Sequence, residues 1–413
     1  MRKTVLKVLL VLLAFVVAGP AALAQQVTLT YWQGWLAPEH QKTEVEIVEE
    51  FMRRNPDIRV DFAHMNNPGE QVKVAYAGGV LADVVVSSRD DFPDWQGIGA
   101  FMDLTHFLEK EAAFKDEFIP QLLELFQVDG RQYGLPYSAN GRGLFSYEVD
   151  PLLEAGLGEP GLEPWSWSEF VENGKKLTRY DGFEMTQAAF GVDRTPMSVW
   201  TWFWSNGTDI FNEDFTEINS SPAFMETLEF LRSLIHEHDI APVPGVSVPK
   251  VVIGSGVGPW AFVPWKQRYE EGGPQRKLMW QPYNGTPQRV AMVGGSGLQI
   301  ASTTKHPEEA WRLLSYLTSE EVQWKRYMEG YGTSSLRNNL VRASQMTDGP
   351  VPEPQDIYWE SFSYGFVQPS FPLYRRWSSI WNNYTQQVLL GELSVNAAVE
   401  HIVGETEALF AAE

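Results

Sequence analysis

The most informative segment of the chain reads Asp129-Gly130-Arg131-Gln132-Tyr133-Gly134-Leu135-Pro136-Tyr137 and runs on to Gly143-Leu144-Phe145-Ser146-Tyr147. Asp129-Gly130 favours a tight hairpin turn. The residues that follow predict a strand, a polar and aromatic crossing without a helix, and a second strand. A crossing of this kind suits a passage between two lobes, so we expect its residues to face a cleft.

The sequence before this segment alternates between strand and helix patterns. Residues 27–31 and 58–62 alternate apolar and polar side chains, as half-buried strands do, and residues 83–86 form a continuous apolar run typical of a buried parallel strand. Between them, residues 39–54 and 70–76 have helical spacing. The order strand, helix, strand, helix, strand predicts an α/β lobe.

The sequence after this segment predicts a second lobe and then a return to the first. Residues 152–177 and 223–236 are expected to be helical, and residues 278–283 and 296–301 to be strands. Residues 306–317 predict an amphipathic helix, and residues 318–321 read as a capping box for the next helix. Residues 348–354 predict a Pro-rich loop, and residues 359–410 are expected to rejoin the second lobe. About three crossings between lobes would make a hinge that bends without letting the lobes separate.

Several of these motifs resemble those of a known family. Residues 129–137 are similar to its "D-G-K-x-Y-G-x-P", followed by Ala155-Gly156-Leu157 and by Trp165-Ser166-Trp167-Ser168-Glu169-Phe170. Gly294-Gly295-Ser296-Gly297 and the block from His306-Pro307-Glu308-Glu309-Ala310-Trp311 to Gln323 also match. The chain thus resembles the extracellular solute-binding proteins of ABC importers, in particular the large sugar-binding, maltose-binding-protein-like group.

The resemblance implies an α/β, two-lobed periplasmic-binding-protein fold with a hinge and a ligand cleft between the lobes. It implies a monomeric receptor that passes a sugar to the membrane subunits of an ABC permease, and not an enzyme. With residues 1–24 set apart as a signal peptide, we expect the N-terminal lobe to comprise residues 25–136 and 290–340. The C-terminal lobe would comprise residues 137–289 and 341–413.

The first residues have the features of a secretory signal peptide. A basic start, Met1-Arg2-Lys3, precedes an apolar run over residues 8–17 and the small residues Ala22-Leu23-Ala24. The run is short for a membrane anchor, which is the alternative interpretation. We expect cleavage near Ala24. Because the chain contains no cysteine, we expect no lipid anchor and a freely soluble periplasmic protein.

Composition narrows the class of partner. The chain has 32 basic and 53 acidic residues, and removing Arg2, Lys3 and Lys7 leaves 29 against 53, a net charge of −24. Such a surface repels nucleic acid and anionic lipid, and it favours a neutral or cationic ligand. Sixteen tryptophans provide flat, rigid, amphipathic surface that suits sugar rings.

Candidate ligand-binding residues follow the predicted strands of the first lobe, because ligands of open α/β sheets bind beyond the carboxyl ends of the strands. Gln33 and Trp35 follow the first strand, and Asp90 and Asp91 follow the third. Trp35 would stack on a sugar, and the acids would accept hydrogen bonds from hydroxyl groups. The alternatives are a core ring and a solvated acidic loop. A metal site at Asp90, Asp91 and Asp94 lacks support, because hard cations require several converging oxygens.

The lobe crossing supplies Tyr137, Asn140 and Arg142, with a ring for stacking and a guanidinium fork for hydrogen bonding. The alternative is a structural network at the hinge. Further candidates are the backbone amides around Gly294, Gly295 and Ser296, close to a ligand because glycine has no side chain. A flexible turn is the alternative there.

The other aromatic candidates lie in the second lobe. Residues 200–204 read Trp-Thr-Trp-Phe-Trp, so that on a helix Trp204 shares a face with Trp200 while Trp202 points elsewhere. A plain core is the alternative for both Trp202 and Trp204. Trp260 follows a glycine-rich segment that lacks the lysine and serine of a nucleotide loop. Tyr364 and Arg375 are candidates from the C-terminal part.

No catalytic or metal-binding set stands out. The chain has no cysteine and no His-Glu-x-x-His motif, and no pair of carboxylates is singled out among its 53 acids. We expect no cofactor, no metal and no catalytic residue. The alternatives are a receptor for a polyol or a glycerol-phosphate-type solute, a secreted carbohydrate-active enzyme, and an adhesion module.

Overall fold

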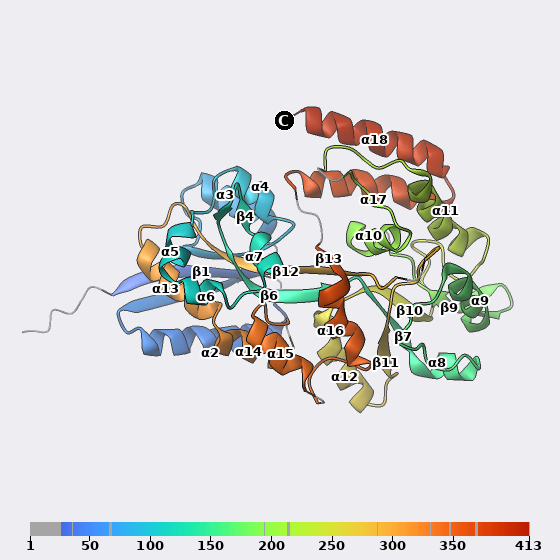
Figure 1. Ribbon diagram of the computed structural model, residues 1–413, viewed down its shortest axis with the longest axis horizontal. Coiled ribbons are helices and arrows are strands. Elements are labelled where there is room, and N and C mark those ends of the chain that lie inside the picture. The colour runs from blue at the N-terminus through green and yellow to red at the C-terminus, as the bar shows by residue number, and fades with distance from the viewer. Residues whose placement is uncertain are drawn as a thin grey trace, which may run out of the picture.

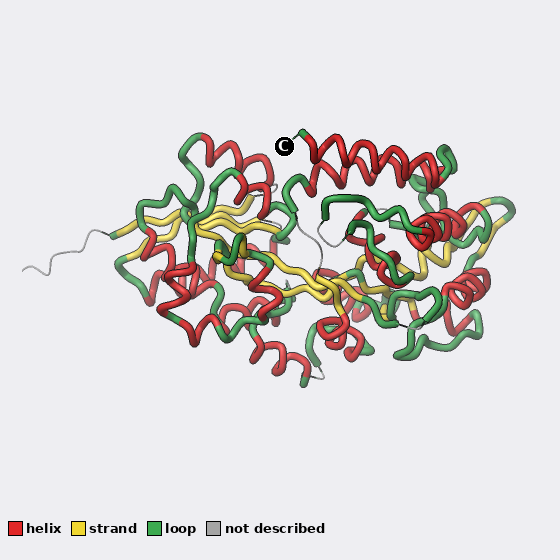
Figure 2. The backbone as a smooth tube through the Cα atoms, turned by 45° about the horizontal axis from the view of Figure 1, so that its top comes forward, coloured by secondary structure: helices red, strands yellow, loops and turns green. Residues whose placement is uncertain are grey.

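The computed structural model describes residues 26–412 apart from residues 35, 66–67, 194, 213–214, 287, 331, 347 and 368–370. Two lobes lie side by side, each with a sheet covered by helices (Figure 1). The tube view shows the same two-lobed arrangement, with strands running from one lobe towards the other (Figure 2). Trp35 and the predicted signal peptide lie outside the described residues.

The sheet of the first lobe has six strands, which are β1 (Val27–Gly34), β2 (Ile58–Met65), β3 (Val84–Ser88), β6 (Leu135–Arg142), β12 (Ala291–Ile300) and β13 (Gly365–Val367). The order is β13-β12-β3-β1-β2, and β6 pairs with β12. Strand β1 is parallel to β2 and β3, whereas β12 is antiparallel to β3 and β6. This lobe is therefore a mixed sheet in which β12, from late in the chain, completes the early strands.

The helices and hairpin of the first lobe are α2 (Pro38–Arg54), α3 (Pro68–Ala77), α4 (Phe92–Gly97), α5 (Thr105–Lys110), α6 (Ala112–Lys115), α7 (Pro120–Glu124), β4 (Gln127–Val128), β5 (Arg131–Gln132), α13 (Pro307–Leu317) and α14 (Glu320–Met328). The predicted hairpin is confirmed, since Asp129 and Gly130 have φ values of 50° and 74° between β4 and β5. Two left-handed residues in succession are what a type I′ turn requires.

The second sheet has five strands in the order β11-β7-β10-β9-β8, with bounds β7 (Leu144–Glu148), β8 (Arg179–Asp181), β9 (Glu184–Phe190), β10 (Lys250–Val257) and β11 (Arg276–Met279). Its helices are α8 (Val149–Glu154), α9 (Trp167–Leu177), α10 (Pro196–Ser205), α11 (Pro222–His236), the 3₁₀ helix η1 (Pro259–Ala261), α12 (Phe262–Glu270), α17 (Tyr374–Leu390) and α18 (Val395–Ala411). Helices α15 (Arg337–Ser344) and α16 (Gln355–Tyr364) lie between α14 and β13 in chain order.

The chain passes between the two sheets three times, the number expected from the sequence. It leaves β6 for β7 at Gly143, returns from β11 to β12, and leaves β13 for α17. Strand β6 stays with the first sheet through Arg142, beyond the boundary expected at residues 136 and 137. Gly143 has a φ of 73°, and a Cβ atom there would lie 2.7 Å from Thr201 Cγ2. The first passage is therefore a tight turn that only glycine accommodates without strain.

The two lobes have separate cores of different character. The first core is mainly aliphatic, from β1, β3 and β12 with α2 and α13. The second gathers many aromatic rings of α9, α10 and α17, among them Trp200, Trp202, Trp377 and Trp381. A smaller cluster around Leu144, Leu278 and Tyr358 joins the sheets. Burial of apolar surface thus stabilises each lobe independently, with a further cluster where they meet.

Two local predictions are wrong. The helix expected over residues 152–177 is interrupted between α8 and α9, and the capping box expected at residues 318–321 is absent. Ser319 begins α14, but its side chain makes no capping hydrogen bond. A capping box occurs instead at α9, where Ser166 Oγ accepts from the Glu169 amide and Glu169 Oε2 accepts from the Ser166 amide. No described helix has the length and apolar character needed to cross a membrane.

Candidate functional site

The carboxyl end of β3 carries a buried, charged cluster. Asp91 is 1% exposed, and its Oδ2 accepts a hydrogen bond of 2.7 Å from Ser88 Oγ. Arg89 is 1% exposed, and its Nη1 lies 3.4 Å from Asp90 Oδ1. Burial lowers the pKa of Arg89 to about 10, with Asp90 opposing the shift and Arg142 adding to it. The predicted Asp90 and Asp91 therefore lie in a paired network and not in a solvated loop.

The second lobe reaches this cluster through the start of α17. Arg375 Nε donates to Asp91 Oδ1, and this bond raises the pKa of Arg375. The Leu373 amide donates to Asp94 Oδ1 at 2.8 Å. Arg375 is thus a contact between the lobes. Since its side chain is 54% exposed, solvent weakens this ion pair.

Strands β6 and β12 pair at the junction of the lobes and contain six predicted site residues, which are Tyr137, Asn140, Arg142, Gly294, Gly295 and Ser296. Asn140 lies opposite Gly294, and a Cβ atom on Gly295 would lie 2.2 Å from the Ser138 carbonyl oxygen. The amide of Ser296 faces Ser138 Oγ at 3.4 Å. Gly295 therefore serves the close approach of the two strands. We expected Gly295 to present its backbone amide to a ligand. The structure instead shows it packed against the neighbouring strand.

Arg142 ends β6 beside these glycines. A Cβ atom on Gly294 would lie 3.5 Å from Arg142 Nε and 3.3 Å from Arg89 Cδ, so both arginine side chains pass over this position. Two of the Arg142 nitrogens, Nε and Nη2, are buried and have no hydrogen-bond partner among the described residues. Sequence reasoning selected Arg142 and missed Arg89, although Arg89 adjoins the selected Asp90.

Gln33 and Tyr137 lie deeper in the first lobe. Gln33 is fully buried, and its Nε2 has no partner among the described residues. Tyr137 packs in the first core, with the Arg326 guanidinium 5.0 Å from its ring centroid, and burial raises the pKa of its hydroxyl. Tyr137 is therefore placed in the core and not on an open face of the cleft.

The aromatic run of α10 divides between core and junction. Trp202 is 1% exposed and packs edge-on against Phe145, Phe170 and Phe190, so the prediction that it lines the cleft is wrong. Trp204 stacks on Phe366 of β13, with centroids 4.7 Å apart. Because Phe366 is 46% exposed, it presents the open ring of this pair. Sequence reasoning missed Phe366, since nothing in its local pattern links it to α10.

A shared acid fixes the orientation of Trp204. Trp200 Nε1 donates to Asp209 Oδ1 at 2.5 Å, and Trp204 Nε1 donates to Asp209 Oδ2 at 2.8 Å. One carboxylate thereby holds two indoles on the same helix face, as their spacing of four residues predicts. The Trp204–Phe366 stack is consequently a preorganised flat surface at the lobe junction.

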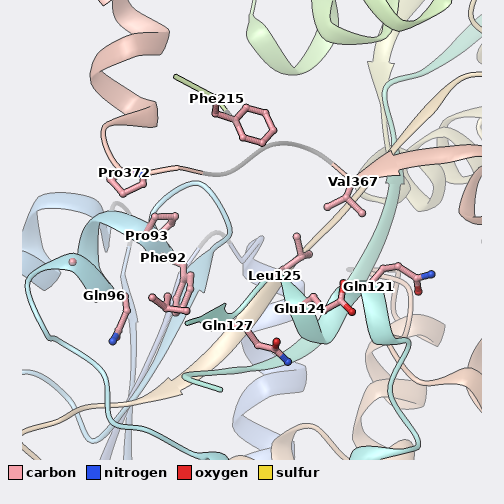
Figure 3. Close-up of a pocket in the computed structure, with 12 residues that line it drawn as sticks. Phe92, Pro93, Gln96, Gln121, Glu124, Leu125, Gln127, Phe215, Val367 and Pro372 are labelled. Atoms are coloured by element: carbon pink, nitrogen blue, oxygen red, sulfur yellow. The ribbon is translucent and has the colours of Figure 1, made fainter. Parts of the chain in front are cut away.

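A cavity of about 590 Å³ opens between the lobes (Figure 3). Its walls come from α4, α7 and β4 of the first lobe, from β13, and from segments before α11 and α17. Apolar side chains dominate, with glutamine amides between them; the lining residues are Phe92, Pro93, Gln96, Gly97, Gln121, Glu124, Leu125, Gln127, Val128, Phe215, Val367 and Pro372. This volume and mixture of groups are typical of small-molecule sites.

None of these lining residues was selected from the sequence, but two adjoin the groups described above. Phe92 follows Asp91, and Val367 follows Phe366. Tyr364 lies elsewhere, 49% exposed, in a separate depression with Glu163 and Arg289. Trp260 is 46% exposed on η1 and lines neither space. Among the described residues, no group of three histidine or acidic side chains could hold a metal ion.

Comparisons with known proteins agree with this architecture. A family model described as bacterial extracellular solute-binding protein matches residues 37–324. The arabinooligosaccharide-binding protein of Bacillus subtilis is 24% identical over 370 residues, covering 83% of this chain and 82% of that protein. The lactose-binding protein of Rhizobium radiobacter is 24% identical over 382 residues, covering 86% and 85%.

Solved structures share the fold. An ABC substrate-binding protein from Listeria monocytogenes in complex with cycloalternan has a TM-score of 0.81 and 22% identity, covering 94% of this chain and 99% of that chain. A maltose/maltodextrin-binding domain from Bdellovibrio bacteriovorus bound to maltotriose has a TM-score of 0.77 and 20% identity, covering 93% and 100%. At these identities the likeness establishes the two-lobed fold.

Proposed function

The chain belongs to the bacterial extracellular solute-binding proteins, and on that premise we propose that it binds a sugar between its lobes and delivers it to an ABC permease. The observation that carries the proposal is the cavity of about 590 Å³ between the lobes, beside the Trp204–Phe366 stack. The arabinooligosaccharide- and lactose-binding relatives support a saccharide as the solute.

The geometry favours binding without chemistry. Apolar walls and an exposed ring suit the flat faces of a sugar, and glutamine, asparagine and arginine side chains can hydrogen-bond hydroxyl groups. A disaccharide has about 23 heavy atoms, and at about −0.3 kcal/mol per atom its binding free energy is about −7 kcal/mol, or roughly ten micromolar. Such an affinity suffices for uptake and needs no catalytic step.

Closure of the lobes is the signal that we propose for the permease. A ligand shifts the balance between open and closed forms only by binding the closed form better. The Arg375–Asp91 and Leu373–Asp94 contacts join the lobes on one side of the cavity, and the three chain passages form the hinge. We keep the lobe bounds expected from the sequence, except that the first lobe also includes β6 through Arg142 and strand β13, and we infer a monomer.

We also propose that the protein is exported to the periplasm, with cleavage near Ala24, and that it lacks a lipid anchor and enzymatic activity. The family description as extracellular supports export. The basic, apolar and small-residue order of the first 24 residues supports a cleaved signal.

A thermal-shift screen of the mature protein against mono-, di- and trisaccharides and polyols tests the function. A sugar receptor should gain melting temperature with at least one saccharide, because a ligand that binds only the folded state stabilises it. Chromatography of the same mixtures should recover every sugar unchanged. Cleaved products would identify an enzyme, and a shift with polyols alone would replace the sugar by that solute class.

A substitution at Phe366 tests where the sugar binds. Phe366→Ala should weaken the ligand-induced shift, because it removes the exposed ring of the junction. Phe183→Ala is a matched control, since Phe183 is fully exposed on the turn between β8 and β9. Equal shifts in Phe366→Ala and the unmodified protein would place the sugar elsewhere.

A further inference from the structure

The guanidinium of Arg142 lies at the junction of the lobes. Its Nε and Nη2 atoms are buried without a hydrogen-bond partner, and it forms no ion pair with any carboxylate in the described part of the chain. Burying a charged group without partners is costly, so a cation in this state calls for an acceptor that a ligand would supply.

The neighbouring carboxylates do not bind Arg142, because each is already hydrogen-bonded or ion-paired with another group. Asp91 accepts from Ser88 through one oxygen and from Arg375 through the other. Asp94 Oδ1 accepts from the Leu373 amide, and its Oδ2 lies 3.8 Å from Lys73 Nζ. Asp90 pairs with Arg89. None of these three acids forms an ion pair with Arg142.

A second arginine, Arg89, lies close to Arg142 beside Gly294. The Cβ position of Gly294 is 3.3 Å from Arg89 Cδ and 3.5 Å from Arg142 Nε. Arg142 contributes to the lowered pKa of Arg89, as expected when two like charges share a poorly solvated site. An anion beside the two arginines would relieve both the repulsion and the missing hydrogen bonds.

We propose that the solute is a sugar carrying an anionic group, which the guanidinium of Arg142, with Arg89 beside it, binds at the junction of β6 and β12. This inference rests on the proposed function and names its substrate class. A guanidinium matches a carboxylate or a phosphate through two parallel hydrogen bonds, whereas a neutral hydroxyl satisfies one donor.

The net charge of the whole chain does not oppose this inference. Charges on the surface are screened over about 8 Å at physiological ionic strength. Arg89 is buried and Arg142 is partly buried, so their interaction with a bound anion is screened less. The acidic composition favoured a neutral or cationic ligand. At the site itself, Arg89 and Arg142 favour an anionic one.

Calorimetry on the full mature protein with matched probes tests the inference. The panel pairs each neutral mono-, di- and trisaccharide with its uronate, such as galactose with galacturonate, and adds the uronate methyl ester and the sugar 6-phosphate. We expect at least tenfold tighter binding of a uronate or a sugar phosphate than of its neutral partner, and loss of this preference in the methyl ester. The uronate and phosphate arms distinguish the two anionic sources.

The outcomes separate this inference from the proposed function. Neutral sugars binding as tightly as their acids would overturn the inference and leave the sugar receptor intact. Failure of every sugar, neutral or acidic, would overturn both.

Variants assign the preference to Arg142. Arg142→Gln should lower the uronate affinity far more than the neutral-sugar affinity, and Arg142→Lys should retain part of the preference. Arg59→Gln is the matched control, because it removes the same charge at a side chain that is 62% exposed on β2. An equal loss for acidic and neutral sugars in Arg142→Gln would contradict the assignment. If that variant does not fold, the methyl ester on the unmodified protein decides the point.

Discussion

The aromatic residues of α10 and the charged residues after β3 differ in two respects. Their sequences suggest different roles, and in each case the structure reverses the suggestion. The run suggested a ligand surface, yet Trp200 and Trp202 are buried in the second core and Trp204 is almost covered. The charged residues were consistent with a solvated loop, yet Arg89 and Asp91 are among the buried residues of the chain. The more conspicuous sequence feature is mainly structural, and the plainer one lies at the junction of the lobes.

The difference follows from what burial costs each kind of side chain. A buried tryptophan needs only apolar neighbours and one acceptor, so its burial carries no information about a ligand. A buried arginine or aspartate needs a specific partner for its charge. Arg142 lacks one among the described residues, and for this reason it carries the proposal of an anionic solute while the buried rings do not.

Removing a core ring should have the largest effect. Trp202→Ala should reduce the free energy of unfolding by about 3–5 kcal/mol, because it leaves a large cavity among Phe145, Phe170 and Phe190. Urea denaturation measures the change. Trp260→Ala, at an exposed tryptophan, is the control and should cost much less. Equal losses in the two variants would remove the distinction between core and surface rings.

Disturbing the junction of the strands should have an intermediate effect. Gly295→Ala would place a Cβ atom 2.2 Å from the Ser138 carbonyl oxygen, so β6 and β12 must move apart. We expect a loss of about 1–3 kcal/mol in the same denaturation experiment. Gly404→Ala, in the exposed middle of α18 with no atom within 4 Å of the new Cβ, should instead stabilise by roughly 0.5–1 kcal/mol. If Gly295→Ala leaves the free energy of unfolding unchanged, β6 and β12 can move apart at no cost, which would contradict the prediction.

Loosening the contact between the lobes should have the smallest effect on stability. Arg375→Gln and Asp91→Asn each weaken a partly exposed ion pair, which is typically worth about 0.2–1 kcal/mol. Because the pair joins α17 to the first lobe, small-angle scattering should detect a larger radius of gyration in Arg375→Gln before ligand is added. The double variant isolates the coupling of the two residues. An unchanged radius would show that the pair does not hold the lobes together.

Sequence reasoning recovered most elements and the fold, because strand alternation, helical spacing and the Asp129-Gly130 turn are local signals. It selected Asp91 after the third strand and Arg142 in the lobe crossing, and their role in ligand binding stays a prediction. It could not find Phe366 or Phe215, because the lobes bring these residues to the cavity through contacts distant in sequence. It also misjudged Trp202, since helical spacing gives the direction of a ring and does not give the depth of its burial.

The position of β12 in the first sheet has a consequence for synthesis. Its residues, Ala291–Ile300, lie between strands made from the first half of the chain. A nascent polypeptide of some 280 residues has therefore produced β1, β2, β3 and β6 but not the strand that bridges β3 and β6. Because pairings distant in sequence form slowly, we expect β6 to join the first sheet only after residues 291–300 have been synthesised.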